Sequence, residues 1–298
     1  MNNKQASPEN RPSLLHDGLY LLSMLIFGTN GLLVARLSLS ASQIVLLRTL
    51  IGGAALTAVV LLRGGFDRSA LRTERISLLL GGTALGLNWI ALFEAYRLLN
   101  VSLATLLYYV GPMLVLLLSP LLFREKLRGA KLAALGLVAV GLVCISGSIK
   151  RGSGHAPGLA AGLLSALFYA ALIVFNKRIK RSSGLQTAAI ELDTAFVVVL
   201  VYVLLTSSLP RPQRADLPYL AVIGLVNTAL AYLLYFSAVQ RLSGQTVALL
   251  SYADPVSALL FSALFLREAL TPLQLLGAVL IIGGAALGER GGTRSPEP

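Results

Sequence analysis

The stretch Tyr108-Tyr109-Val110-Gly111-Pro112 places a proline in the middle of a long apolar run, and Ser251-Tyr252-Ala253-Asp254-Pro255 repeats this arrangement 143 residues later. Proline cannot donate a hydrogen bond to the carbonyl four residues earlier, so we expect helix breaks at Gly111, Pro112 and Pro255. In lipid, the released carbonyls must meet protein, water or a polar cavity. One broken helix in each half of a chain indicates a binding site near the membrane midplane.

The repeat extends well beyond the two prolines, and it needs no gap. At the same offset, Phe93 aligns with Phe236, Arg124-Glu125 aligns with Arg267-Glu268, and Gly141 aligns with Gly284. Chance matches of Leu and Ala are common in apolar sequence, so the matches of Pro, Tyr, Arg-Glu and Gly carry the argument. The predicted organisation is an N-terminal tail (1–16), a first repeat (17–150), a second repeat (151–290) and a C-terminal tail (291–298).

The composition indicates an integral membrane protein. The chain of 298 residues is 56% hydrophobic and 13% charged, whereas soluble domains carry about 25% charged residues. A net charge of +12 would suggest nucleic-acid binding in a soluble protein. Here the basic residues lie between apolar runs, where membrane orientation explains them, and we expect no nucleic-acid partner.

Ten segments are long enough to span a membrane, which takes about 20 apolar residues. They lie at roughly 17–37, 42–62, 76–98, 101–123, 129–149, 157–177, 184–206, 216–239, 244–266 and 271–289, and the longest interior loop is 63–75. With the N-terminus inside, 17 Lys and Arg residues fall on the cytoplasmic side and 7 on the other side. This asymmetry predicts a bacterial-type inner-membrane protein with both termini cytoplasmic.

The number of spans in each repeat determines the fold class that we expect. Five is odd, so the second repeat must run through the membrane in the opposite direction to the first. The prediction is an all-α membrane protein, with ten transmembrane helices in two inverted five-helix repeats around a central cavity.

Several of these motifs resemble those of the drug/metabolite transporter superfamily. They are Phe27-Gly28-Thr29-Asn30, Arg48, the paired prolines, Arg124-Glu125-Lys126-Leu127 and Arg267-Glu268-Ala269-Leu270. Over its whole length the chain looks like a ten-helix EamA-type member. The resemblance implies two inverted repeats and a cavity lined mainly by spans 1, 3, 4, 6, 8 and 9. It also implies export or exchange of small metabolites.

Asp254 lies near the centre of the ninth span, where a charge costs several kcal/mol unless it is protonated, paired or hydrated. Two interpretations stay open. Asp254 is either a carboxylate that binds a coupling proton or another cation, or the cap of a helix that begins at Pro255. Glu94 precedes Arg97 by three residues, which predicts an ion pair. Glu191 and Asp193 need partners that the sequence does not name.

Polar and aromatic residues recur at helical spacing in the spans expected to line the cavity. Thr228, Tyr232 and Tyr235 share one helical face. The predicted substrate-binding residues are Asn30, Asn88, Trp89, Tyr108, Tyr109, Asn227, Tyr232, Tyr235 and Tyr252. We expect no Lys or Arg deep in the cavity-lining spans, which argues against a phosphorylated or dicarboxylate substrate.

This expected wall favours an amphipathic zwitterion. Freed carbonyls of Tyr108 and Ser251, together with Asp254, suit an ammonium group, and the half-helix N-termini beyond the prolines suit a carboxylate. The prediction is a secondary active transporter that exports or exchanges small metabolites by alternating access, with amino acids or close relatives as substrates. The alternative is efflux of a heteroaromatic or cationic compound, such as a nucleobase or a drug-like amine.

The sequence contains none of the motifs that would indicate an enzyme or a cofactor site. HExxH, P-loop and Cys/His-cluster patterns are absent from it. We therefore expect no enzymatic activity, no metal and no cofactor. The expected partners are a small-molecule substrate, membrane lipid and, if Asp254 carries coupling, protons; the oligomeric state, monomer or homodimer, stays open.

Overall fold

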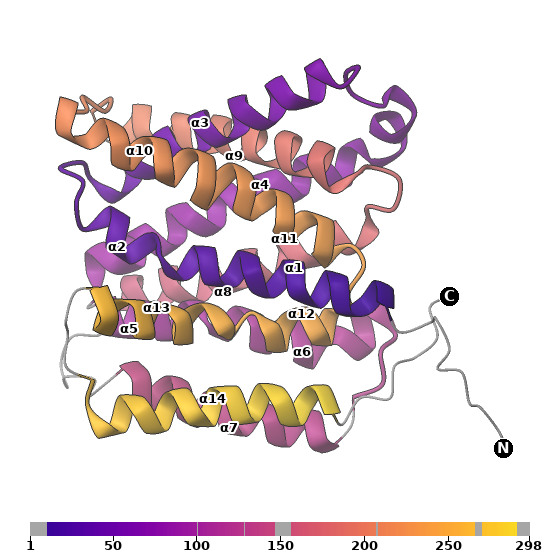
Figure 1. Ribbon diagram of the computed structural model, residues 1–298, viewed down its shortest axis with the longest axis vertical. Coiled ribbons are helices and arrows are strands. Elements are labelled where there is room, and N and C mark those ends of the chain that lie inside the picture. The colour runs from indigo at the N-terminus through magenta and orange to yellow at the C-terminus, as the bar shows by residue number, and fades with distance from the viewer. Residues whose placement is uncertain are drawn as a thin grey trace, which may run out of the picture.

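The structure of the protein is a computed structural model in which helices pack side by side (Figure 1). It describes residues 11–99, 101–127, 129–146, 156–206, 208–265 and 270–290. Parts of the sequence predictions lie outside these ranges: residues 1–10 of the N-terminal tail, the repeat boundary at 150 and 151, the Arg267-Glu268 motif and the C-terminal tail.

The described helices form ten spans, five in each half. The first half contains α1 (Arg11–Gly28) continued by α2 (Asn30–Val34), α3 (Ala41–Leu62), α4 (Arg68–Leu98), α5 (Val101–Tyr108) continued by α6 (Val110–Phe123), and α7 (Gly129–Ser146). The second half contains α8 (Ala156–Arg178), α9 (Gly184–Thr206), the 3-10 helix η2 (Arg214–Asp216), α10 (Leu217–Gly224), the π-helix η3 (Leu225–Leu230), α11 (Ala231–Val239), α12 (Gly244–Leu250), α13 (Ala253–Phe265) and α14 (Pro272–Arg290).

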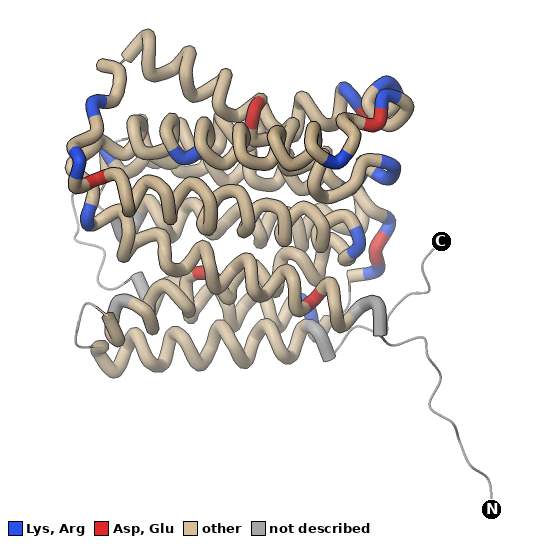
Figure 2. Tube along the Cα trace, turned by 45° about the horizontal axis from the view of Figure 1, so that its top comes forward, with Lys and Arg blue, Asp and Glu red and all other residues tan. Residues whose placement is uncertain are grey.

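Length and composition make these helices a membrane domain, as predicted. Eight described spans are long and apolar enough to cross a membrane, and Gly129–Cys144 and Pro272–Gly288 are shorter apolar helices. Large apolar side chains are exposed around the bundle, among them Leu121 at 80% and Val279 at 66%. A soluble monomer rarely exposes so much apolar surface. Lys and Arg lie mostly near the ends of the helices (Figure 2).

The contact between α7 and α14 displays the inverted repeat directly, and the two helices lie side by side in Figure 1. A Cβ added to Gly141 would lie 2.7 Å from the carbonyl oxygen of Gly277, and one added to Gly284 would lie 2.9 Å from that of Ala134. Gly141 and Gly284 are 143 residues apart, and so are Ala134 and Gly277. Residues at this offset occupy equivalent positions in the two repeats and are called repeat mates here. Each helix therefore makes the same contact on the other, as a pseudo-two-fold axis requires.

Two carboxylates repeat this symmetry at opposite ends of the bundle. Glu74, near the start of α4, accepts hydrogen bonds from the backbone N–H groups of residues 180–182 at 2.6–2.8 Å. Asp216, at the start of the equivalent span, accepts from the backbone N–H of Ser38 at 3.0 Å and from its hydroxyl at 2.7 Å. Ser38 and residue 181 are repeat mates. Each carboxylate thus ties its span to a loop of the other repeat.

The fourth and ninth spans are broken near the paired prolines, although the expected break positions Gly111, Pro112 and Pro255 lie inside α6 and α13. The breaks fall at Tyr109, between α5 and α6, and at Ser251 and Tyr252, between α12 and α13. Pro112 and Pro255 are each the third residue of the half-helix that follows the break. The N–H groups of a first helical turn have no partner within the helix, so proline costs little there.

The predicted loop 63–75 is shorter than expected, because α4 already begins at Arg68. Asp67 caps this helix by accepting hydrogen bonds from the backbone N–H groups of Ser69 at 2.8 Å and Ala70 at 3.2 Å. The first two turns of α4 are polar, so a search for apolar runs misses them. The cap residue itself was a readable signal.

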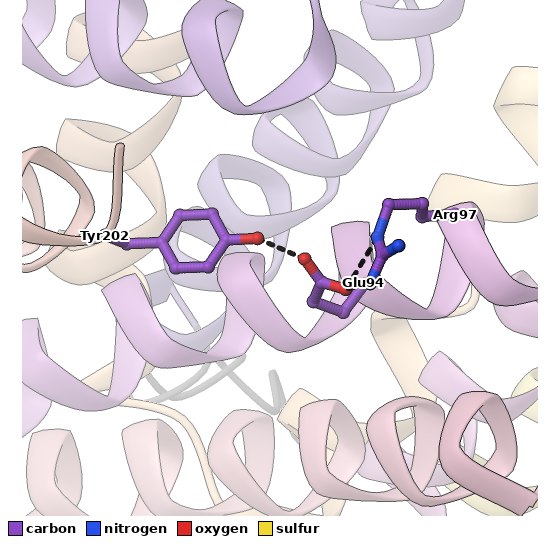
Figure 3. A network of polar contacts seen from close by, with 3 residues as sticks. All are labelled: Glu94, Arg97 and Tyr202. Carbon is purple, nitrogen blue, oxygen red and sulfur yellow. Dashed lines mark hydrogen bonds and ion pairs between the residues drawn. The ribbon is translucent and has the colours of Figure 1, made fainter. Parts of the chain in front are cut away.

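The other carboxylates of the spans have neutral or basic partners. Asn176 donates to both carboxylate oxygens of Glu191 at 3.0 Å, and Thr57 donates to Asp193 at 2.6 Å. The predicted ion pair between Glu94 and Arg97 is present, with Nη2 and Oε2 2.6 Å apart. Figure 3 shows the Tyr202 hydroxyl pointing at the other oxygen of Glu94, to which it donates a hydrogen bond.

Candidate substrate cavity

A cavity of about 630 Å³ lies among spans from both repeats. Seven of the nine predicted substrate-binding residues line it, as do Asp254 and Pro112: Asn30, Asn88, Trp89, Tyr108, Tyr109, Tyr232 and Tyr235. Spans 1, 3, 4, 6, 8 and 9 contribute, as the family resemblance implies, and α3 of the second span contributes as well. The cavity reaches Val34 and Ala41, where α2 ends and α3 begins.

The end of the bundle where α1 begins and α14 ends is here called the chain-end face, and the other end the opposite face. Figure 1 shows that α2 ends and α3 begins at the opposite face. The lining residues Val34 and Ala41 lie at these two helix ends, so the cavity extends towards the opposite face. At the chain-end face, Glu125 accepts from the backbone N–H groups of Gly244 at 2.6 Å and Gln245 at 3.1 Å. Gln245 also donates to Ser119 at 2.7 Å and accepts from Lys131. These contacts join α6 and α7 to α12 beneath the cavity.

Asp254 is the second residue of α13, and its Oδ2 accepts a hydrogen bond from the Tyr109 hydroxyl at 3.1 Å. It therefore does not precede the helix, as a cap followed by Pro255 would. The Ser251 carbonyl, which we expected to be free, accepts from the N–H of Asp254 at 3.2 Å. The described residues hold no group of three or more His, Cys, Asp or Glu that could bind a metal ion.

Ser251 organises a hydroxyl cluster that was not predicted from the sequence. Its hydroxyl donates to the carbonyl of Val247 at 2.6 Å, so it accepts from the hydroxyls of Tyr20 at 2.8 Å and Tyr169 at 2.7 Å. Ser251 and Tyr169 also line the cavity. The cluster ties α1 and α8 to the break in the ninth span. A signal for it in the sequence was a serine in mid-span, four residues before Pro255.

Arg48 corrects the expectation that the cavity has no deep cation. It projects from α3 into the cavity wall and is only 8% exposed. Its Nε donates to the Thr228 hydroxyl at 2.9 Å, and Nη2 donates to the carbonyl of Asn227 at 3.2 Å. The Arg48 guanidinium carbon lies 5.3 Å from the centre of the Trp89 ring. The sequence places Arg48 inside the second span, which was not among the spans expected to line the cavity.

Aromatic rings form much of the cavity wall. The rings of Trp89 and Tyr232 meet edge to face with centres 5.7 Å apart, and those of Phe27 and Tyr232 are 4.9 Å apart. Tyr108 packs edge to face on Tyr169 at 5.7 Å. Such pairs hold one another in fixed orientations while leaving ring surface for a ligand.

Two of the predicted binding residues lie behind this wall. Asn227 donates to the carbonyl of Ile26 at 2.8 Å and to the hydroxyl of Thr29 at 2.7 Å, and so supports the break between α1 and α2. Tyr252 donates to the carbonyl of Tyr109 at 3.2 Å and packs against α7 and α14. Both residues support the cavity's shape, and a sequence cannot distinguish support from direct lining.

Two buried polar atoms of the lining have no hydrogen-bond partner within the described part of the chain. They are Oδ1 of Asn30 and the hydroxyl of Tyr235. Buried polar groups are rarely left without a partner, so each is a candidate to bind water or a ligand. Together with Arg48 and Asp254, they give the cavity donors, acceptors and charges of both signs among aromatic rings.

The sequence itself matches a known family in both repeats. The EamA-like transporter family matches residues 15–147 and again residues 156–288. This chain belongs to the EamA-like transporter family. The resemblance drawn from the motifs is thereby confirmed, and the duplicated match agrees with the symmetry between α7 and α14.

Individual relatives extend the comparison to named transporters. The uncharacterized transporter YxxF of Bacillus subtilis is 26% identical over 90% of this chain and 87% of its own length. The aromatic amino acid exporter YddG of Ancylobacter novellus is 28% identical over 65% of this chain and 69% of its own length. A solved crystal structure, 24% identical, matches with a TM-score of 0.82 over 92% of this chain and 96% of that chain, which supports the fold.

Proposed function

We propose that this EamA-family member is a secondary active transporter that exports or exchanges amino acids or closely related amphipathic zwitterions. One observation carries the proposal: the cavity combines an aromatic wall with one acidic and one basic side chain, Asp254 and Arg48. A zwitterion with an apolar or aromatic side chain has a matching group for each of these features. The name of the relative from Ancylobacter novellus, an aromatic amino acid exporter, points in the same direction.

Alternating access is the mechanism that we propose for this transport. The cavity extends towards the opposite face, and the Glu125 contacts join the halves at the chain-end face. In an inverted repeat, rocking of the two halves exchanges the open and the closed face. From the distribution of Lys and Arg, we propose that the chain-end face is cytoplasmic in a bacterial-type inner membrane. On this assignment, the structure is an outward-open state.

The second candidate is efflux of a heteroaromatic or cationic compound. Asp254 and the aromatic rings would be sufficient for such a ligand, because a cation can pair with the carboxylate while its ring stacks on the wall. A substrate of this kind would leave Arg48 without a function in binding. In either case we propose a carrier and not an enzyme.

Thermal unfolding of the purified protein in detergent separates the two candidates, because a ligand that binds the folded state raises its stability. The ligands are phenylalanine, phenylalanine amide, phenethylamine and adenine. We expect phenylalanine to raise the midpoint of unfolding, and the other three to raise it less or not at all at equal concentration. Equal stabilisation by the amide or the amine, or stabilisation by adenine alone, would overturn the amino-acid proposal.

A further inference from the structure

We propose that Arg48 binds the carboxylate of the transported molecule. The inference rests on the proposed function, and it names the residue that recognises one end of the substrate. It replaces the expectation from the sequence that half-helix N-termini receive that carboxylate.

The guanidinium of Arg48 is held in a fixed orientation with hydrogen-bonding capacity left over. An arginine carries five N–H donors in a planar fork. Thr228 accepts from Nε and the Asn227 carbonyl accepts from Nη2, while the Trp89 ring packs on the group. The N–H bonds of Nη1 have no acceptor among the described residues. A fixed fork with free donors suits a carboxylate, which accepts two parallel bonds.

The charge of Arg48 is also left without a partner. No carboxylate within the described ranges forms an ion pair with it, and the residues that accept its hydrogen bonds are neutral. A buried charge is expensive unless it is paired. An anionic group entering the cavity would supply the missing countercharge, so Arg48 favours substrates that carry one.

The half-helix N-termini are poorer places for the carboxylate. The N-terminus of α13 carries Asp254 as its second residue, and that carboxylate would repel an anion. The first turn of α6 is covered by Tyr169, since a Cβ added to Gly111 would lie 2.9 Å from the Tyr169 ring. Arg48 is therefore the cation that remains available.

This assignment gives the substrate a direction in the cavity. Arg48 comes from α3 and Asp254 from α13, and in Figure 1 these two helices lie on either side of α1. The carboxylate would face α3, and the ammonium group would face α13. The side chain would then lie along the rings of Trp89 and Tyr232.

Binding of matched ligands to Arg48 variants tests the assignment. Phenylalanine and phenethylamine differ in the carboxylate, so the ratio of their affinities measures its recognition. We expect Arg48→Gln to weaken phenylalanine binding about tenfold or more and to change phenethylamine binding less than about threefold. Arg48→Lys keeps the charge but loses the fork, and it should fall between wild type and Arg48→Gln. Arg97→Gln removes an arginine outside the cavity and should change neither affinity.

The possible outcomes separate this inference from the proposed function. If wild-type protein binds no amino acid, the proposed function fails first. If wild-type protein binds phenylalanine and Arg48→Gln weakens both ligands equally, the amino-acid function stands and the role of Arg48 is overturned. A general loss of folding would appear as a lower unfolding midpoint without ligand, and it is distinguished in that way from a loss of selectivity.

A measurement on the wild-type protein covers the case in which the variants do not fold. Phenylglyoxal modifies accessible arginines, and mass spectrometry locates the modified residue. We expect saturating phenylalanine to protect Arg48 from modification, and phenethylamine at saturation to leave it reactive. Equal protection by both ligands, or by neither, would contradict a bond between Arg48 and the carboxylate.

Discussion

At the scale of single residues, Asp254 and Tyr109 form the contact that links the two broken spans inside the cavity. The Tyr109 hydroxyl donates to the carboxylate at 3.1 Å, and the two residues stand beside the breaks of their spans. Asp254 therefore combines a substrate-facing position with a bond to the other repeat. Such a carboxylate could exchange a proton for the ammonium group of a substrate.

Replacing Asp254 by Asn tests this role. If Asp254 carries a coupling proton, Asp254→Asn should abolish the dependence of net transport on pH and should leave exchange of bound substrate largely intact. Asn keeps a side-chain oxygen that can accept from the Tyr109 hydroxyl, so a purely structural role of Asp254 predicts little change. The measurement is net uptake and exchange in proteoliposomes between pH 5 and 8. An unchanged pH dependence in the variant would remove Asp254 from coupling.

Most of the residues predicted to bind substrate do line the cavity, but the sequence did not predict the position of Arg48. Trp89, Tyr108 and Tyr232 were predictable because aromatic residues deep in a span seldom belong to the interfacial belt. Arg48 lies in the second span, which the repeat does not identify as part of the cavity wall. One turn further along α3, Gly52 packs closely on η3, since an added Cβ would lie 2.6 Å from the Thr228 side chain. That close packing is a property of two helices together and cannot be read from either one.

At the scale of elements, α12 and its contacts join the two repeats at the chain-end face. Glu125 binds two backbone N–H groups at the start of α12, and Phe123 covers Gly244 so closely that a Cβ there would lie 2.4 Å from its ring. The repeat mates of α12 and α6 are α5 and α13, which both line the cavity. We expect these two pairs to exchange roles when the transporter changes its open face.

Hydrogen exchange can measure the strength of the Glu125 contact. In Glu125→Gln, the side-chain amide accepts poorly from both N–H groups, so exchange at Gly244 and Gln245 should accelerate about tenfold or more. Glu94→Gln changes the glutamate that pairs with Arg97, away from α12, and should leave exchange at these two amides unaltered. Unaltered exchange in Glu125→Gln would mean that the contact does not keep this face closed.

Replacing a helical glycine by alanine should change stability in opposite directions at an open position and at a helix contact. An alanine in place of a helical glycine usually adds about 0.5–1 kcal/mol of stability. Gly136 has no neighbour within 4 Å of an added Cβ, so Gly136→Ala should raise the unfolding midpoint. At Gly82 the added Cβ would lie 2.6 Å from the Cβ of Thr194 and 2.7 Å from the Glu191 carbonyl oxygen. Gly82→Ala should lower the midpoint, and a rise there would contradict the packing of α4 on α9.

At the scale of the whole molecule, the sequence predicted the architecture better than the details. The offset of 143 residues connects Gly141 to Gly284, and the structure turns this match into a symmetric contact between α7 and α14. A duplicated pattern survives in the sequence because both copies need the same small residues. The start of α4 at Arg68 was missed, because its first turns are polar and only Asp67 marks them.

The proposed orientation can be tested with single cysteines in a Cys144→Ala background. Arg68→Cys, at the start of α4, and a cysteine in the tail 291–298 should react only with reagents that reach the cytoplasm. Arg211→Cys, in the connection before α10, should react from outside intact cells. Labelling of Arg68→Cys from outside would reverse the orientation. If the tail and Arg68→Cys lie on different sides, the even number of spans is wrong.

Counterflow in proteoliposomes tests the central claim, that the chain is an alternating-access carrier of amino acids. Vesicles loaded with unlabelled phenylalanine are diluted into a trace of labelled phenylalanine. A carrier returns to the outer face loaded, so we predict a transient accumulation of label above its outside concentration, with a rate that saturates with phenylalanine. Label that only equilibrates, at a rate proportional to its concentration, would indicate a channel, and no flux above that of empty vesicles would contradict the claim altogether.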